Sequence, residues 1–335
     1  MSANPQGILF RIGGLGDLLV ALPSISLVRQ SLPDHILTLV GRPEYAVLLI
    51  RSGLVNEFVS FDDPRISSLF QGEEGPVSGH PWLSRFRLAM GWLGRLGDWP
   101  ADDWWTKHGV ESAHFMAYQD GVNMPMSRFF FERTHDFIKD IKVMTPADRR
   151  CCQRDVAENP ARGSDDIFAA HSRLPIDRAL RQEGLGYFGL GPLGRKTRRL
   201  VIHPGSGGRT KRWPFARFLE VIRRAASLGF EGVLVTGEAE ADYELLLKRE
   251  PLPAGWSWAA RPPLLMLAGL LAESTAYLGN DSGPTHLAAA CGASVVALFR
   301  ADNEPAWRPF GKTRVISAPS IEDIPLASVL SALEL

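Results

Sequence analysis

Residues 203–214, with the sequence HPGSGGRTKRWP, combine the residue types that bind phosphate groups. Glycines let a ligand approach the backbone closely, while hydroxyls, backbone amides and a positive charge can all contact phosphate oxygens. The candidate contacts are Ser206, Gly207, Thr210 and Lys211. The spacing is not that of a Walker A loop, so it predicts a phosphate-binding turn of another kind. The alternative is a solvated basic turn in front of a helix.

Residues 279–290, GNDSGPTHLAAA, repeat this design later in the chain. Small polar residues follow an expected strand and precede a proline suited to the first turn of a helix, whose free amides could bind a second phosphate oxygen. Ser282 could instead be an ordinary helix cap, and His286 a packed core histidine. Two such turns in one half of the chain are harder to explain as ordinary turns, and they favour phosphate contact.

Two carboxylates follow another expected strand, in the sequence TGEAE over residues 236–240. Glu238 and Glu240 could accept hydrogen bonds from ribose hydroxyls. Exposed acids at the start of a helix are an equally good interpretation. The residues alone leave both interpretations open.

Near the N-terminus, the sequence GGLGD of residues 13–17 places a carboxylate where a strand ends and a helix begins. Open α/β sheets bind ligands at this edge, so Asp17, beside Gly14 and Gly16, could face a cleft. An acid in the first turn of a helix is also a common cap. On this motif alone, the cap is the simpler interpretation.

The same glycines match the first half of a dinucleotide-binding GxGxxG motif. The third glycine position holds Leu19, and the next expected strand ends in Gly41 and Arg42 rather than in the acid that would bind a ribose. These differences weaken an NAD site. Arg42 could meet the extra phosphate of NADP, so an NADP-dependent oxidoreductase is a second candidate function.

Alternating strands and helices are expected to position these motifs, and such alternation predicts parallel sheets. In the first sixty residues we expect strands over 7–12, 35–41 and 57–61, a helix over 18–32 kinked by Pro23, and a helix over 43–51. In the second half we expect strands over 200–203, 232–236, 275–279 and 294–299, and helices over 215–228, 239–248, 262–272, 284–291 and 321–335.

The stretch from about residue 70 to 166 loses this regularity, and we expect helices and long loops there. It is rich in tryptophan between Trp82 and Trp105; these rings could line an acceptor groove or touch lipid headgroups, but a buried core is the simpler interpretation. The glycine-rich stretch 184–194 is typical of a linker. The expected domains are residues 1–190 and 196–320, followed by a closing helix over 321–335.

The composition agrees with two globular domains and excludes some functions. The chain has 335 residues, 45% of them hydrophobic and 22% charged, which allows two cores. Its 37 basic residues balance 37 acidic ones, so no global field favours nucleic acid. The cysteines, Cys151, Cys152 and Cys291, form no zinc motif, and neither a signal peptide nor a membrane-spanning run is visible. We therefore expect a reduced, cytoplasmic protein.

Taken together, the motifs resemble glycosyltransferase family 9, whose best-known members are the bacterial ADP-heptose:lipopolysaccharide heptosyltransferases. The resemblance lies in GxGD near the N-terminus, HPGS and KRWP at mid-chain, GxxE after the next strand and NDSGPxHLAAA late in the chain. It covers residues 7–60 and 199–310. It implies an α/β chain with a GT-B fold, in which two doubly wound Rossmann-like domains face each other across a cleft, an acceptor domain first and a nucleotide-sugar domain second.

The resemblance also implies roles for single residues. Asp17 becomes the general base that takes the proton of the acceptor hydroxyl. The donor contacts are Ser206 and Lys211 for the diphosphate, Glu240 or alternatively Glu238 for the ribose, Asp281 for the donor sugar, and Ser282, Gly283 and His286 around the phosphates. No Asp-x-Asp sequence occurs, so we expect transfer without a metal or another cofactor.

The implied activity is inverting transfer of a sugar, typically heptose from ADP-heptose, to a hydroxyl of a glycan or a lipopolysaccharide-core-type glycolipid. The expected place is the cytoplasm, where the protein could contact the inner face of the membrane peripherally. A third candidate is a non-catalytic nucleotide-sugar-binding protein, in which Asp17 is only a cap.

Overall fold

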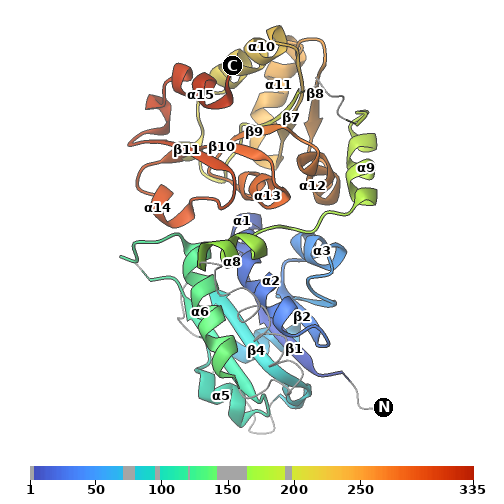
Figure 1. The fold of residues 1–335 in the computed structure, drawn as a ribbon, viewed down its shortest axis with the longest axis vertical. Helices are drawn as coiled ribbons and strands as arrows, with labels where there is room; N and C mark the ends of the chain where they lie inside the picture. Colours follow the sequence, from blue (N-terminus) through green and yellow to red (C-terminus); the bar gives the residue numbers. More distant parts are fainter. Residues whose placement is uncertain (1–3, 71–79, 95–98, 120, 142–163, 193–197) are drawn as a thin grey trace. The chain divides into compact units, whose positions relative to one another are not determined.

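The computed structural model describes residues 4–70, 80–94, 99–119, 121–141, 164–192 and 198–335. The chain forms two compact units, residues 1–172 and 173–335, each built around one parallel sheet (Figure 1). Two of the three cysteines, Cys151 and Cys152, lie outside the described residues. The two sheets confirm the expected α/β fold with two Rossmann-like units.

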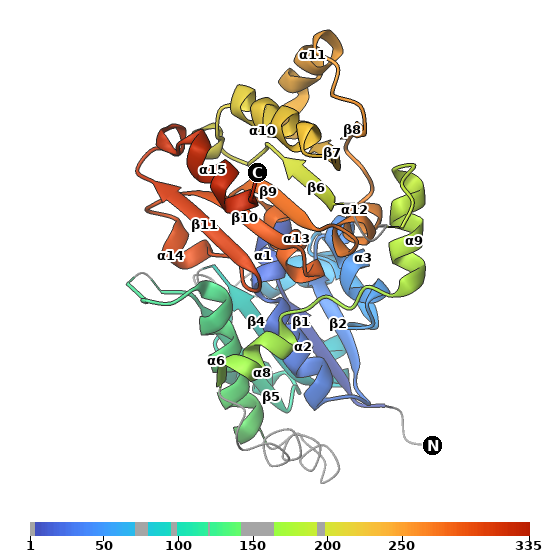
Figure 2. The same ribbon diagram turned by 45° about the horizontal axis from the view of Figure 1, so that its top comes forward.

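The sheet of the first unit has five parallel strands in the order β3-β2-β1-β4-β5. They are β1 (Gln6–Phe10), β2 (Ile36–Gly41), β3 (Glu57–Ser60), β4 (Phe86–Leu93) and β5 (Ser112–Ala117). The central strand β1 lies between β4 and β2 (Figure 2). It pairs with β2 on one side and with β4 on the other, and residues 7–10 of it are glycine or fully buried apolar residues. The strand order reverses between β1 and β4, which is where open α/β sheets bind ligands.

The stretch after residue 70 contains helices, as expected, over Asp102–Lys107 and Met126–Asp140, but it also contains β4 and β5, which were not expected. Both faces of β4 are buried, so its sequence FRLAMGWL lacks the alternation of apolar and polar residues that marks a half-buried strand. Trp92 and Trp105 are fully buried, as the core interpretation of the tryptophan-rich segment expects.

The helices of the first unit cover both faces of its sheet. They are α1 (Leu15–Val20), α2 (Leu22–Ser31), α3 (Pro43–Arg51), α4 (Pro64–Ser67), α5 (Asp102–Lys107), α6 (Met126–Asp140) and α8 (Ser164–His171), with short 3-10 turns over Ser68–Phe70 and Pro81–Arg85. The kink expected at Pro23 is a full break at Ala21, because Pro23 takes an early position in a new helix. On one face α2 packs against α6 and α8, and on the other the rings of Trp105 and Phe115 stack.

The sheet of the second unit has six parallel strands in the order β11-β10-β9-β6-β7-β8. They are β6 (Arg198–His203), β7 (Phe230–Thr236), β8 (Trp256–Ala260), β9 (Ala276–Asn280), β10 (Ser294–Arg300) and β11 (Thr313–Ala318). Four of them were expected from the sequence, whereas β8 and β11, the two edge strands, were not. The order reverses between β6 and β9, so this unit has its own switch point.

Helices lie on both faces of this second sheet as well (Figure 1). They are α9 (Arg178–Tyr187), α10 (Phe215–Ser227), α11 (Ala241–Arg249), α12 (Leu264–Ala272), α13 (Gly283–Cys291), α14 (Glu304–Trp307) and α15 (Leu326–Leu333). The apolar sides of α10 and α15 pack on one face, where Phe218 and Val329 are fully buried, while α12 and α13 cover the other. Within the described ranges, no helix has both the length and the hydropathy needed to cross a membrane.

Helix α9 packs on α12, so it belongs to the second unit although the sequence suggested a domain boundary near residue 190. The two helices touch through glycines. A Cβ atom added to Gly184 would lie 2.7 Å from the backbone nitrogen of Leu270, and one added to Gly269 would lie 2.3 Å from the carbonyl oxygen of Leu180. Of the described glycines in the expected linker, Gly184 therefore serves helix packing, whereas a Cβ atom added to Gly186, Gly189 or Gly191 would have no atom within 4 Å.

We predict that Gly269→Ala destabilises the second unit by about 1 to 3 kcal/mol, because the methyl group would push two backbones apart. The measurement is the free energy of unfolding in urea. Gly186→Ala is the matched control, since it adds a methyl group to the same helix pair where no atom lies within 4 Å. It should be neutral or stabilising by up to about 1 kcal/mol. Equal effects of both substitutions would contradict close helix contact.

Candidate functional site

In the second unit, the predicted donor residues lie on loops that leave the same edge of the sheet. Ser206 and Lys211 follow β6, Glu240 follows β7, and Asp281 and Ser282 follow β9. Because all strands are parallel, their carboxyl ends meet at one edge. The loops after β6 and β9 flank the switch point, so the two glycine-bearing turns are neighbours.

The carboxylate of Asp281 connects these loops. It is 7% exposed, and its Oδ2 accepts a hydrogen bond from Nζ of Lys211 at 2.7 Å and another from the side-chain amide of Asn303. The backbone oxygen of Asp281 accepts a hydrogen bond of 2.7 Å from the hydroxyl of Ser206. The structure thus brings three of the predicted donor residues into one cluster, together with Asn303, which lies after β10 outside any motif.

The buried side chain of Asn280 holds the loop after β6 in place. The side-chain amide of Asn280 donates to the carbonyl oxygen of Pro204 at 2.7 Å, and its Oδ1 accepts from the backbone N–H of Trp213 at 3.1 Å. The Trp213 ring is fully buried and donates to the carbonyl of Ile324 at 3.0 Å. A cavity of about 250 Å³ borders the end of this loop, lined by Arg209, Arg212, Trp213, Pro214, Phe215, Asp242 and Tyr243.

The carboxylate of Glu240 is buried under this loop, whereas Glu238 is exposed. Glu240 accepts a hydrogen bond from the backbone N–H of Gly237 at 2.7 Å and lies 3.7 Å from the guanidinium of Arg212. A Cβ atom on Gly205 would lie 2.2 Å from the carboxylate, so the glycine makes room for it. Burial of 98% means that Glu240 supports the loop here rather than presenting its oxygens to solvent.

The loop after β9 leads directly into α13. Ser282 occupies the N-cap position, and its hydroxyl lies 3.1 Å from the Thr285 hydroxyl instead of capping the helix. Gly283 is the first helical residue, so its amide has no partner within the helix. His286 is 2% exposed, with its ring centroid 6.4 Å from that of Trp307. This agrees with the packed-histidine interpretation.

The remaining predicted contacts on the loop after β6 are open to solvent. Gly207 and Thr210 are exposed, and Lys211 is about one-third exposed while it pairs with Asp281. Exposed backbone and hydroxyl groups next to a held ammonium group can contact a phosphate without moving the core. In the described part of the chain, no three His, Cys, Asp or Glu side chains group as a metal site.

In the first unit, Asp17 lies in the first turn of α1 and is both a cap and an ion-pair partner. Its Oδ2 accepts the backbone N–H of Gly14 at 2.8 Å, and its Oδ1 lies 3.1 Å from the guanidinium of Arg11. The side chain is 34% exposed, so it keeps access to solvent. Gly13 has a φ of 131°, a conformation that favours glycine, and Gly16 lies within α1.

Arg11 is a residue that the sequence analysis missed. It is 3% exposed, and besides Asp17 it binds the carbonyl oxygen of Trp92 at 2.7 Å, so it joins the ends of β1 and β4 at the switch point. Burial lowers the pKa of Arg11 to about 10, and the charge of Asp17 opposes this shift. Arg11 is thus charged at neutral pH. The sequence feature that could have identified Arg11 is an arginine at the end of an apolar strand, six residues before the candidate base.

Comparisons with known proteins agree with the motifs. The family model described as glycosyltransferase family 9 (heptosyltransferase) matches residues 164–327. Lipopolysaccharide heptosyltransferase 3 of Escherichia coli is 29% identical over 125 residues, which are 35% of each chain. Lipopolysaccharide heptosyltransferase 1 of Pseudomonas aeruginosa is 31% identical over 152 residues, 44% of this chain and 42% of that one. The aligned stretches thus span less than half the length of these curated relatives.

Solved structures share the fold over the whole chain. ADP-heptose lipopolysaccharide heptosyltransferase II of Escherichia coli has a TM-score of 0.70 at 19% identity and covers 98% of this chain and 97% of its own. A glycosyltransferase family 9 protein of Veillonella parvula has a TM-score of 0.70 at 15% identity, with 100% and 98% covered. The fold is therefore GT-B, and the C-terminal part of the chain, residues 164–327, is similar to glycosyltransferase family 9.

Proposed function

We propose that this protein is an inverting glycosyltransferase that moves a sugar from a nucleoside-diphosphate donor, ADP-heptose, to a hydroxyl of a glycan or lipopolysaccharide-core-type acceptor. The observation that carries the proposal is the cluster of Ser206, Lys211 and Asp281, in which two glycine-bearing turns meet at the switch point of the second sheet. The family match supports a transferase over an NADP-dependent oxidoreductase.

The second unit provides charge and hydrogen-bond donors for the leaving nucleoside diphosphate. The ammonium group of Lys211, the exposed turn around Gly207 and Thr210, and the amide of Gly283 at the start of α13 would bind the phosphate oxygens. Stabilising the charge that develops on the leaving group lowers the barrier of the transfer. These groups can do so without a metal ion. Asp281 would orient the donor sugar. Lys211, which binds the Asp281 carboxylate, would lie next to both the sugar and the phosphates.

The first unit provides the base. As the acceptor oxygen attacks the anomeric carbon, its proton would pass to the carboxylate of Asp17 while the bond from the anomeric carbon to the diphosphate oxygen breaks. Attack opposite the leaving group inverts the anomeric centre. Arg11 and the Gly14 amide hold the carboxylate in one orientation, which is what a general base requires.

The relatives' names also guide the proposal for donor, acceptor and place. One similar solved structure is described as an Escherichia coli heptosyltransferase with ADP-2-deoxy-2-fluoro heptose, and others as lipopolysaccharide heptosyltransferases. We infer the same donor class and a glycolipid acceptor here, used in the cytoplasm with peripheral contact at the membrane. A thermal-stability screen over nucleotide sugars tests this, because a bound donor raises the melting temperature by mass action. Equal responses to ADP-heptose and to NADPH would contradict the proposal.

We predict that Asp17→Asn lowers turnover by about two to four orders of magnitude, since the amide cannot accept the proton. Turnover is measured with ADP-heptose and acceptor, and ADP binding should be unchanged. Asp63→Asn is the matched control, because Asp63 also caps a helix of the first unit and pairs with an arginine. Full activity in Asp17→Asn would leave Asp17 as a cap only.

We predict that Lys211→Gln weakens ADP binding by about 1.5 to 3 kcal/mol, the range for a hydrogen bond to a charged group. Isothermal titration calorimetry measures the loss. Lys248→Gln, which removes an exposed charge at the end of α11, serves as the control for a general change in net charge. Undiminished ADP affinity in Lys211→Gln would mean that the lysine only balances the buried Asp281.

A further inference from the structure

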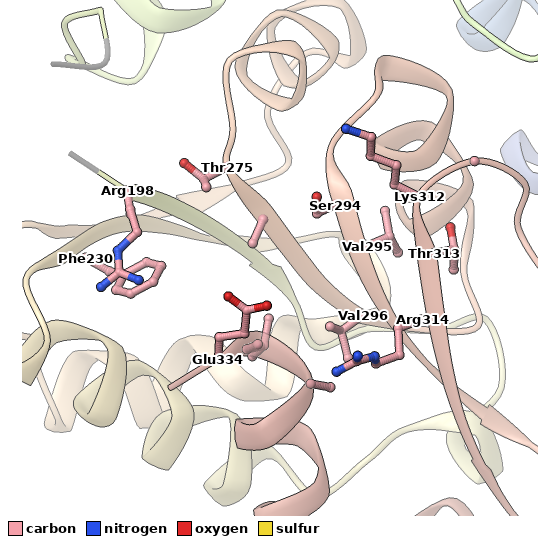
Figure 3. A pocket seen from close by; sticks show the side chains of 14 residues that line it. Arg198, Phe230, Thr275, Ser294, Val295, Val296, Lys312, Thr313, Arg314 and Glu334 are labelled. Carbon is pink, nitrogen blue, oxygen red and sulfur yellow. The ribbon is translucent and has the colours of Figure 1, made fainter. Parts of the chain in front are cut away.

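A larger pocket lies at the opposite edge of the second sheet from the donor loops. Its volume is about 490 Å³, which is within the usual range of small-molecule sites. It is formed where β6, β7, β9, β10 and β11 begin and where α15 ends (Figure 3). The donor loops follow the carboxyl ends of the strands, so this pocket is separate from them.

Three cationic side chains surround the pocket. Arg198, Lys312 and Arg314 are all exposed, and within the described residues none of them forms an ion pair. The one acid in the lining is Glu334, which Figure 3 shows rising from the end of α15 between Arg198 and Arg314. Positive charge thus exceeds negative charge, which favours an anionic ligand.

The pocket also has an apolar floor. Val295 and Val296 of β10 and Leu333 of α15 line it and are buried. The guanidinium of Arg198 lies 4.1 Å from the ring centroid of Phe230, which restrains this arginine beside the floor. An inorganic anion would use the charges but leave the floor in contact with water. A ligand with a charged head and a short apolar part would use both.

We propose that this pocket binds a phosphate monoester that carries an apolar chain. A planar guanidinium group such as that of Arg314 matches the geometry of phosphate oxygens. Arg198 and Lys312 add positive charge at other points of the lining. The hydroxyls of Ser294 and Thr313 line the same pocket. Such a monoester can be a soluble phosphorylated molecule or the headgroup of a lipid. The site does not depend on the proposed glycosyl transfer.

The test is calorimetric titration of the full chain with octyl phosphate, in a Lys211→Gln background that removes the donor-site cation. We expect one site. The double substitution Lys312→Gln and Arg314→Gln should raise its dissociation constant about tenfold or more, whereas Glu334→Gln should lower it roughly two- to fivefold. Arg224→Gln, an exposed charge on α10, should change nothing and serves as the control. An unchanged affinity in Arg224→Gln, beside the loss in the double variant, separates a site from a general charge effect.

A second arm distinguishes the sources of the phosphate. Phosphatidylcholine vesicles with and without phosphatidic acid are sedimented with the wild-type chain and with the double variant. Capture by phosphatidic acid that the double variant loses indicates a lipid headgroup. Octyl phosphate binding without capture indicates a soluble ligand. The proposal is overturned if octyl phosphate does not bind, or if the double variant binds it as tightly as the control does.

Discussion

The buried carboxylate of Asp281 is the interaction on which the arrangement of the second unit's site depends. A charge that is 7% exposed is costly unless cations and hydrogen-bond donors compensate it. Here the donors come from two other loops, Lys211 after β6 and Asn303 after β10. Three loops that have no regular backbone pairing with one another are therefore held together before any ligand arrives. A site built this way loses little conformational entropy when it binds a diphosphate.

The first unit also has a buried charged group that a partner of opposite charge compensates, but here the buried group is the cation. Arg11 is the buried charge, and the acid that compensates it, Asp17, remains partly exposed. Because Arg11 also binds the carbonyl of Trp92, the position of the carboxylate is tied to both strands at the switch point. The cap and base interpretations of Asp17 are thus compatible. Bonding to Gly14 fixes the carboxylate, and its exposure leaves it able to accept a proton.

The elements that could be predicted from the sequence are those with a clear local pattern of apolar residues and turns. Strands flanked by glycine turns and amphipathic helices, such as β6 and α10, were expected within two residues of where they lie. Strand β4 was missed because both of its faces are buried, and the edge strands β8 and β11 because they carry mixed residues rather than a clear apolar run. The motifs indicated the cluster around Asp281, but the burial of Glu240 follows from the fold around Gly205, which local sequence does not encode. Asn303 contacts Asp281, 22 residues away in the sequence, and Arg11 joins the nearby Asp17 to Trp92, 81 residues away, so no short motif contains these contacts.

In a parallel sheet, the amino ends of the strands form one edge and the carboxyl ends form another, and the two edges differ in their chemistry. The second unit exposes both. At the carboxyl edge, the chain passes from strand to helix through short turns, so helix amides and glycines are concentrated there. At the amino edge, chain segments arrive from helices, and the side chains of the first strand residues are free to differ in chemistry. In this chain they include Arg198, Lys312 and Arg314 around an apolar floor. Arg198 begins β6, whose other end leads to the turn that holds Ser206 and Lys211, whereas Lys312 and Arg314 lie at the start of β11, which ends at Ala318. A ligand that restrains Arg198 would therefore act on β6, one of the strands that position the donor loops, without any contact with the donor.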